Sequence, residues 1–199
     1  MSVAVRRHAC GSFSMIALSD LIRNCAALST DHISFRPMRH SDLPLLQLWL
    51  SRPHVDAWWH EPLDLAGVVA KYGPRIDGLE PTHMFVIEHE GRAIGWIQWY
   101  RWRDYAAHAA QLGAEPTAAG VDLALGEVEM LRRGIGPAAL ALFIERVVFA
   151  HDVSAVVCDP EERNTRSLRA FEKAGFRIER TIRLHGEPHN RKVVRLDRR

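Results

Sequence analysis

The stretch "MLRRGIGPAAL", residues 130–140, decides the fold because it joins a predicted strand to a predicted helix through a loop rich in arginine and glycine. Residues 121–131 before it alternate apolar and polar side chains, with Glu127 and Glu129 on one face and Val128 and Met130 on the other, which predicts a half-buried strand. Pro137 suits the first turn of a helix. Apolar residues then recur at helical spacing at Leu140, Phe143, Ile144, Val147 and Val148.

This loop has the features of an anion-binding site. The first N–H groups of a helix have no partner inside the helix, and the helix dipole favours negative charge there. Gly134 and Gly136 would let the backbone approach a ligand closely, and the arginines between residues 131 and 134 indicate that the ligand is anionic. The glycines alone are equally compatible with an ordinary turn whose arginines are solvated.

Two common phosphate-binding loops do not fit. A P-loop needs Lys followed by Ser or Thr after its second glycine, whereas Gly136 is followed by Pro137 and Ala138. The dinucleotide pattern is matched by Gly134, Gly136 and Ala139, but the preceding strand carries charges on alternate positions, unlike a strand buried on both faces. The chain after the loop is also too short for the rest of such a domain. The pyrophosphate of coenzyme A remains as a candidate.

A second motif, "DPEERNTRSLRAFEKAGFR", lies at residues 159–177. Asn164 can cap a helix through its side-chain oxygen, and Gly175 stands where a left-handed C-terminal cap is favoured. Leu168, Phe171 and Ala174 form the apolar stripe of this predicted helix.

The two motifs together resemble those of the GCN5-related N-acetyltransferase (GNAT) superfamily. The resemblance implies a mixed α/β (α+β) fold with a mixed central sheet flanked by helices, acetyl-CoA as co-substrate, and no metal. One departure is Leu131, which stands where the superfamily usually has Gln or Arg. The residues that the resemblance assigns to acetyl-CoA are Met130, Leu131, Arg132, Arg133, Gly134, Ile135, Gly136, Pro137, Ala138, Asn164 and Phe171.

Residues 33–59, which include "RPHVDAWW", and residues 120–136 resemble aminoglycoside 6′-N-acetyltransferases. A related branch that acylates lysine-derived amines in siderophore synthesis shares the "RPHV…WW" pattern. The likeness is weak across residues 101–119, which form part of the substrate side in these enzymes. The 6′-amine of an aminoglycoside is therefore the expected acceptor. A siderophore precursor, a polyamine, or a non-catalytic acetyl-CoA-binding role are the alternatives.

The resemblance also implies roles for acids and tryptophans. Asp122 would be the general base that deprotonates the amine; an acid at a strand start can instead bond a nearby N–H. Asp159 and the Trp58–Trp59 pair would contact the substrate, with one indole packed and the other on the sugar. Acids near a polycation raise its local concentration. The residues Glu127 and Glu129 fit either such a site or a solvated face.

Phe171 is a mismatch, because the resembling enzymes usually have a tyrosine there that is suited to protonate the coenzyme A sulfur. Phenylalanine keeps the packing and cannot be an acid. We therefore expect the thiolate to leave unassisted or to take its proton from water.

The remaining sequence predicts a single catalytic domain over residues 33–199 after an extension, residues 1–32, of unknown role. A helix is expected from Ser41 or Asp42, carrying Leu43, Leu46, Leu48 and Leu50. The segment 63–76 is predicted to be helical and broken at Gly73-Pro74, and a hairpin is predicted to turn at Glu90-Gly91. Three strands are expected later in the chain, over residues 154–159, around 176–184 and around 191–196.

Composition excludes several classes of function. The 199 residues carry a formal net charge of +2, too mild for a nucleic-acid partner. Three widely spaced cysteines, Cys10, Cys25 and Cys158, fit reduced thiols in a cytoplasm. His185 and His189 flank a turn and are expected in solvent rather than on a metal. No apolar run is long enough for a membrane span. A monomer or a homodimer is expected.

Overall fold

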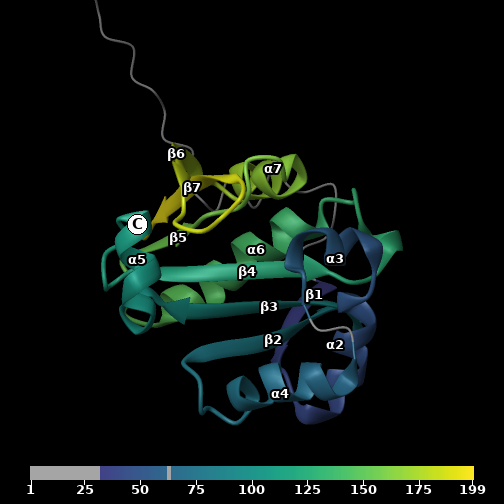
Figure 1. Ribbon diagram of the computed structural model, residues 1–199. Coiled ribbons are helices and arrows are strands. Elements are labelled where there is room, and N and C mark those ends of the chain that lie inside the picture. The colour runs from purple at the N-terminus through teal and green to yellow at the C-terminus, as the bar shows by residue number, and fades with distance from the viewer. Residues whose placement is uncertain (1–31, 62–63) are drawn as a thin grey trace, which may run out of the picture.

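The computed structural model describes residues 32–61 and 64–199, so all but the last residue of the predicted extension lies outside the described part (Figure 1). The core is a mixed seven-stranded sheet in the order β1-β2-β3-β4-β5-β7-β6, which confirms the predicted fold class. The strands are β1 (Ile33–Pro37), β2 (Thr82–His89), β3 (Arg92–Arg101), β4 (Ala119–Leu125), β5 (Ala155–Cys158), β6 (Arg177–Arg183) and β7 (Asn190–Asp197).

The pairing divides the sheet into two antiparallel halves. Strands β1 to β4 pair in sequence order, and the β2–β3 hairpin turns at Glu90 and Gly91 as predicted, with φ angles of 54° and 76°. Two consecutive positive φ angles are typical of the type I′ turn, whose twist matches that of the strands. The second half consists of β5, β7 and β6.

The two halves meet at the parallel pair β4–β5, which is paired at one position only, Ala119 with Val156. Two residues further on, the contact is made by a side chain, because the Cys158 thiol donates to the Val121 carbonyl oxygen over 3.2 Å. The strands therefore diverge toward their C-terminal ends, and part of the β4 backbone is left without a neighbouring strand.

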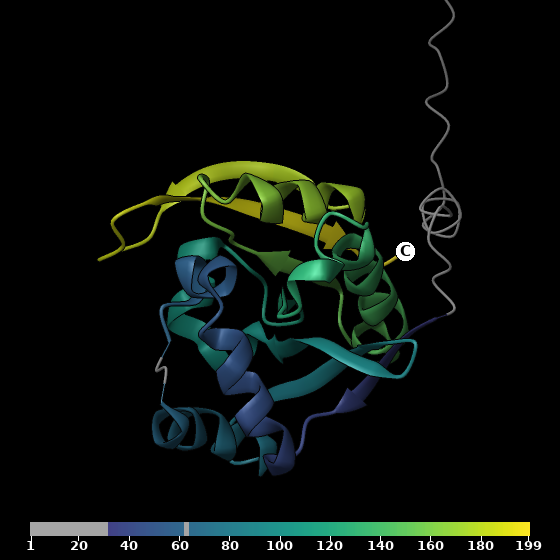
Figure 2. The same cartoon turned by 90° about the vertical axis from the view of Figure 1, so that its right-hand side faces the viewer.

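Helices cover both faces of the sheet, as Figures 1 and 2 show. Alternate residues of β3 mark the faces, since Trp96 packs with α2 and α4 whereas Ile97 packs with α6. Trp96 and Trp99 of β3 and Trp102, which follows it, are all buried. The helices are α2 (Leu43–Leu50), α3 (Pro53–Trp59), α4 (Leu65–Ile76), α5 (Ala106–Leu112), α6 (Ile135–Arg146) and α7 (Thr165–Lys173). Short 3₁₀ turns lie at His40–Asp42, Trp102–Tyr105, Val128–Met130 and Val148–Ala150.

The strand predicted over residues 121–131 is wrong beyond Leu125. The chain leaves the sheet at Gly126, where a Cβ atom would lie 1.9 Å from Cδ1 of the Trp49 indole. Both Gly126 N and Glu127 N donate to the carbonyl of Ile94, which ends the ladder. The alternation continued past the strand by coincidence, and Val128 is 55% exposed instead of buried.

Three helix predictions also need correction. Helix α4 runs through Pro74 instead of breaking there, because Pro74 falls in the last turn, where its missing N–H removes a single bond near the helix end. In α2, Leu48 is 45% exposed and Trp49 is the buried residue. Helix α6 begins at Ile135, two residues before the predicted start at Pro137.

Candidate active site

The loop between β4 and α6 leads to the N-terminal end of α6, where backbone groups are accessible to a ligand. Gly134 is the N-cap of α6 with φ of 78°, and no side chain caps this helix. Arg132 also has positive φ, at 61°, and the side chains of Arg132 and Arg133 are exposed. Met130, by contrast, is buried and its sulfur contacts Arg133 Nη1 at 3.7 Å. The first N–H groups of α6 are therefore available to bind an anion, and the long cationic side chains of Arg132 and Arg133 lie next to them in the sequence.

Helix α7 packs beside α6 and has the caps that the sequence predicts. Asn164 Oδ1 accepts a hydrogen bond from Ser167 N over 3.0 Å, and Gly175 has φ of 96° after the last turn. Phe176 N then donates to the Phe171 carbonyl. The Phe171 ring is 5% exposed and meets the Phe176 ring edge to face at 4.9 Å, in the core that α6 also lines.

The open edge of β4 runs between these two helices and the rest of the sheet. The Val121 and Leu125 carbonyls accept from the Cys158 thiol and from His54 Nε2 (2.9 Å), respectively. Both bonds lie on the edge that faces away from β3, and by the two-residue period of a strand the backbone of Leu123 faces the same way. This edge can pair with an extended ligand as a neighbouring strand would.

Asp122 lies on the same strand and points to the sheet face that α2, α4 and α5 cover. Its Oδ2 atom accepts from Gln98 Nε2 over 3.0 Å, and Gln98 Oε1 accepts from Arg75 Nη1 over 3.2 Å. Arg75 is paired in turn with Glu80. Burial raises the pKa of Asp122, the Gln98 hydrogen bond acts in the opposite direction, and the charge of Asp159 raises it further. Asp122 is thus a carboxylate with a neutral partner and an elevated pKa, as a general base requires.

Two donors near Asp122 are buried without a hydrogen-bond partner. Within the described residues, Tyr72 Oη and Trp96 Nε1 both fall in this class. Burial is also the main cause that raises the pKa of Tyr72, with the nearby carboxylates of Glu61 and Asp122 adding to it. Unsatisfied buried donors are rare in folded proteins, so they indicate a place where a polar ligand or water binds.

The two adjacent tryptophans are both half-buried and have different neighbours. Trp59 packs against Trp96 with ring centroids 5.0 Å apart and joins the core of α2 and α4. Trp58 lies beneath the Arg163 guanidinium, 5.6 Å from its ring centre, and stays half-buried. Trp58 therefore connects α3 to the segment that precedes α7.

Asp159 follows β5 and lies on the same sheet face as Asp122, across the gap between the strands. Its Oδ2 atom lies 3.3 Å from His108 Nε2 and 3.5 Å from Arg191 Nη1. Neither of these basic side chains is among the residues predicted from the sequence, and the same holds for Gln98 and Arg75. A buried amide in the aromatic strand "WIQWYRW" was the available signal for Gln98, whereas His108 lies in a stretch without any motif.

Glu127 and Glu129 are engaged elsewhere, at the end of the β2–β3 hairpin. Arg92 Nη2 lies 3.1 Å from the Glu127 carboxylate and 2.8 Å from that of Glu129. Glu127 also accepts from Trp49 Nε1 over 3.0 Å. Both acids therefore have internal partners and neither joins Asp122.

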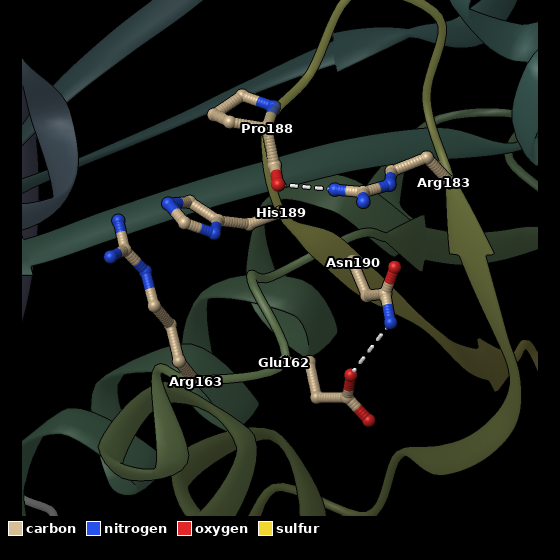
Figure 3. A pocket seen from close by; sticks show the side chains of 6 residues that line it. All are labelled: Glu162, Arg163, Arg183, Pro188, His189 and Asn190. Carbon is tan, nitrogen blue, oxygen red and sulfur yellow. Dashed lines mark hydrogen bonds between the residues drawn. The ribbon is translucent and has the colours of Figure 1, made fainter.

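A separate depression of about 340 Å³ lies between the β6–β7 hairpin and the start of α7, and no predicted site residue lines it (Figure 3). In it, Arg183 donates to the Pro188 carbonyl and Asn190 to Glu162. His189 lines the depression and His185 is exposed. Across residues 32–61 and 64–199, the His, Cys, Asp and Glu side chains form no cluster of three that could hold a metal ion. In the same ranges, every helix is too short or too polar to cross a bilayer.

The chain is similar to known proteins in sequence and in fold. The model of the acetyltransferase (GNAT) domain family matches residues 39–184. The aminoglycoside N(6′)-acetyltransferase type 1 of Klebsiella pneumoniae is 28% identical over 157 residues, which span 77% of this chain and 78% of that protein. The lysine N-acyltransferase MbtK of Mycolicibacterium paratuberculosis is 27% identical over 147 residues, 73% of this chain and 65% of the relative.

A solved structure gives the same result. The aminoglycoside acetyltransferase AAC(6′)-Ib in complex with coenzyme A and kanamycin superposes with a TM-score of 0.71 at 26% identity, covering 83% of this chain and 95% of that one. The family match spans most of the chain and includes Asp122 and the N-terminal ends of α6 and α7. The chain therefore belongs to the GNAT acetyltransferase family and is an N-acetyltransferase of that type.

Proposed function

We propose that the protein transfers the acetyl group of acetyl-CoA to a primary amine, and that its preferred acceptor is the 6′-amine of an aminoglycoside. The observation that carries the proposal is the position of Asp122, an uncompensated carboxylate with a raised pKa beside the open edge of β4. A carboxylate of this kind can take the proton that an ammonium group must lose before it attacks a thioester.

The proposed acetyl-CoA site comprises the loop and helix start from Met130 to Ala138, together with Asn164 and Phe171. The free N–H groups at the start of α6 suit the pyrophosphate, and Arg132 and Arg133 add positive charge. The unpaired edge at Leu123 suits the amide groups of pantetheine, which can pair with it as a strand would. The solved relative that binds coenzyme A supports this assignment.

The proposed reaction is a direct transfer. Asp122 accepts the amine proton, directly or through water, and the amine nitrogen attacks the thioester carbon. Backbone N–H groups on the open edge of β4 stabilise the negative charge that develops on the carbonyl oxygen. The C–S bond then breaks, and the new amide and coenzyme A leave. Phe171 cannot protonate the sulfur, so the thiolate leaves unassisted or takes a proton from water.

The acceptor would lie on the face shared by Asp122, Asp159 and Trp58. A half-buried indole can stack against a sugar ring, and Tyr72 and Trp96 offer buried donors to its hydroxyl groups. Similarity to the kanamycin-bound relative favours an aminoglycoside, and similarity to a lysine N-acyltransferase keeps a lysine-derived amine as the second candidate. Antibiotic resistance in the cytoplasm would be the biological outcome of the first.

Acetyl-CoA consumption with a panel of amines tests the proposal. Turnover of kanamycin and tobramycin supports it, and turnover of hydroxylysine-type amines alone would replace it with the second candidate. Binding of acetyl-CoA without turnover of any amine would indicate a non-catalytic acetyl-CoA-binding role. A chain that starts at residue 33 should retain the turnover, because we propose that residues 33–199 are the catalytic unit.

A further inference from the structure

Two basic side chains contact the Asp159 carboxylate, which we assign to the acceptor site. His108 from α5 and Arg191 from β7 both contact Asp159 Oδ2, at 3.3 and 3.5 Å. Arg191 also donates to the Asp159 carbonyl over 3.1 Å and pairs with Glu187 over 3.3 Å. We call His108, Asp159, Glu187 and Arg191 the Asp159 cluster.

The net charge of the Asp159 cluster depends on one proton. With a protonated imidazole, two acids and two bases cancel. With a neutral imidazole, the cluster carries one uncompensated negative charge. Histidine is the side-chain type whose ordinary pKa lies between pH 5 and 8, so His108 is the member of the cluster whose charge changes there.

The surroundings of His108 set when this change occurs. The Asp159 hydrogen bond is the largest influence and raises the pKa of His108, burial and the charge of Arg191 lower it, and the charge of Asp122 raises it. On its other side the imidazole stacks on the indole of Trp102, with ring centroids 5.2 Å apart and planes 11° from parallel. The folded pKa of His108 therefore lies above its usual value near 6.5.

The position of the cluster gives this charge a role. Val121 and Cys158 are bonded across the gap between β4 and β5, and Asp122 and Asp159 are the next residues on each strand. Both carboxylates therefore face the same side, one on each flank of the gap. An acceptor whose reactive amine lies at Asp122 can reach Asp159 with a second ammonium group of the same molecule.

We propose that His108 is a specificity-determining residue that competes with the acceptor's second ammonium group for Asp159. The protonated imidazole is an internal counter-ion that a second ammonium must displace, and the neutral imidazole leaves Asp159 to the acceptor. The His108 side chain is 40% exposed, so it can move without disturbing the core, while Arg191 stays held by the Asp159 carbonyl and by Glu187. The proposal rests on the proposed function, because it assumes that the acceptor lies on this face.

A kinetic comparison of matched acceptors tests the proposal. Kanamycin B carries an amine where kanamycin A carries a hydroxyl group, so the ratio of their KM values reports the effect of one ammonium group added to those that both antibiotics share. In the native protein, the preference for kanamycin B should increase about three- to tenfold as pH rises through the His108 pKa. His108→Gln should keep the high preference at every pH, and His108→Lys the low one.

The difference between the native protein and His108→Gln cancels the titration of the antibiotics themselves. His185→Gln is the matched control, because His185 is an exposed histidine in the β6–β7 turn. It should behave as the native protein does. The same preference and the same pH dependence in the native, His108→Gln and His108→Lys proteins would overturn the proposal.

A binding experiment separates this inference from the proposed function. The His108 imidazole is followed by NMR, assigned through His108→Gln, in the presence of saturating 1,5-diaminopentane or pentylamine. By linkage, a ligand that prefers the neutral imidazole must lower its pKa, so the diamine should lower it by about 0.5 and pentylamine should not. If neither kanamycin is acetylated, the proposed function fails, whereas an equal His108 pKa with both amines contradicts the inference itself.

Discussion

Gln98 donates from Nε2 to Asp122 Oδ2, and it does so in a fixed orientation because Arg75 donates to its Oε1 atom. Through this amide, Arg75 in α4 helps to fix the orientation of the Asp122 carboxylate on β4. The hydrogen bond favours the ionised form of Asp122 and opposes the effect of burial on its pKa. Gln98 is a positioning residue for the proposed base.

Gln98→Glu should move the pH–rate profile to higher pH. A carboxylate at this position would place a second negative charge about 3 Å from Asp122 and raise the pKa of Asp122 further. The active form of a general base is deprotonated, so the rate should fall on the acid side at a higher pH than in the native protein. The profile of kcat/KM between pH 5 and 9 measures the change. Gln98→Met, which removes the hydrogen bond without adding a charge, should lower kcat and displace the profile in the same direction by a smaller amount. A kcat and a pH profile equal to those of the native protein in Gln98→Met would contradict the positioning role.

Asp122→Asn should lower kcat by about 10²–10⁴ and leave the affinity for acetyl-CoA within about twofold of the native value. The asparagine can still accept the hydrogen bond from Gln98, so the packing is kept while the proton acceptor is lost. Steady-state kinetics and calorimetric titration with acetyl-CoA measure the two effects. Near-native turnover would show that another acid or bulk water accepts the proton.

The same variant should be more stable than the native protein at pH 7.5. The folded pKa of Asp122 is raised above the unfolded value of about 3.9, so the native state binds this proton more tightly than the unfolded state does. The resulting penalty is absent below the unfolded pKa, increases as pH rises toward the folded pKa and is then constant. Asp122→Asn should therefore be more stable than the native protein at pH 7.5, and the difference in the free energy of unfolding should be small at pH 4. Chemical denaturation at both pH values measures this, and an equal gain at both would exclude the charge as its cause.

Gly134→Val should weaken acetyl-CoA binding at least tenfold, about 1.4 kcal/mol. The residue has φ of 78°, a conformation that a β-branched side chain rarely adopts, and a side chain there would occupy the proposed pyrophosphate position. Calorimetry on the folded variant gives the affinity. Gly136→Ala is the control for folding, because its Cβ atom would meet Leu125 Cδ1 at an ordinary 3.9 Å. Unchanged affinity in folded Gly134→Val would remove the loop from the site.

Phe171→Tyr should raise kcat if protonation of the sulfur limits the rate, and it should change the alkaline side of the pH profile, where a phenol titrates near pH 10. The native ring is buried against Phe176, so the new hydroxyl has no evident partner in the protein alone and should lower stability by about 1–3 kcal/mol. Kinetics and thermal unfolding are measured on the same sample. An unchanged kcat and pH profile in the folded variant would mean that sulfur protonation is not limiting.

Features set by local chemistry could be predicted from the sequence. The turn at Glu90-Gly91, the Asn164 cap and the Gly175 terminus each depend on a few adjacent residues, and the structure contains all three. The predicted strand end was wrong because Gly126 is excluded from the sheet by Trp49, which lies 77 positions earlier in the chain. The alternation of apolar and polar residues within the strand gives no information about a contact with a residue so distant in the sequence.

The candidate site shows the same division between local and distant information. Asp122 and the loop around Gly134 belong to contiguous motifs, so the sequence identified them as candidates. The partners of Asp122 and Asp159 come from other elements, and the contact between His108 and Asp159 spans 51 residues. A lone histidine in a stretch without periodicity gives no indication of the carboxylate that it meets.

The single paired position between β4 and β5 has a mechanical consequence. The two halves of the sheet are joined mainly through side chains instead of a continuous ladder of backbone bonds. The core around Phe143 includes residues from both halves, and Trp102 Nε1 donates to the Val157 carbonyl. A pulling force applied across the strands should therefore separate β4 from β5 before either half of the sheet unfolds. A co-substrate bound between β4 and β5 would hold the two halves together, so the force needed to separate them should be higher when the co-substrate is bound.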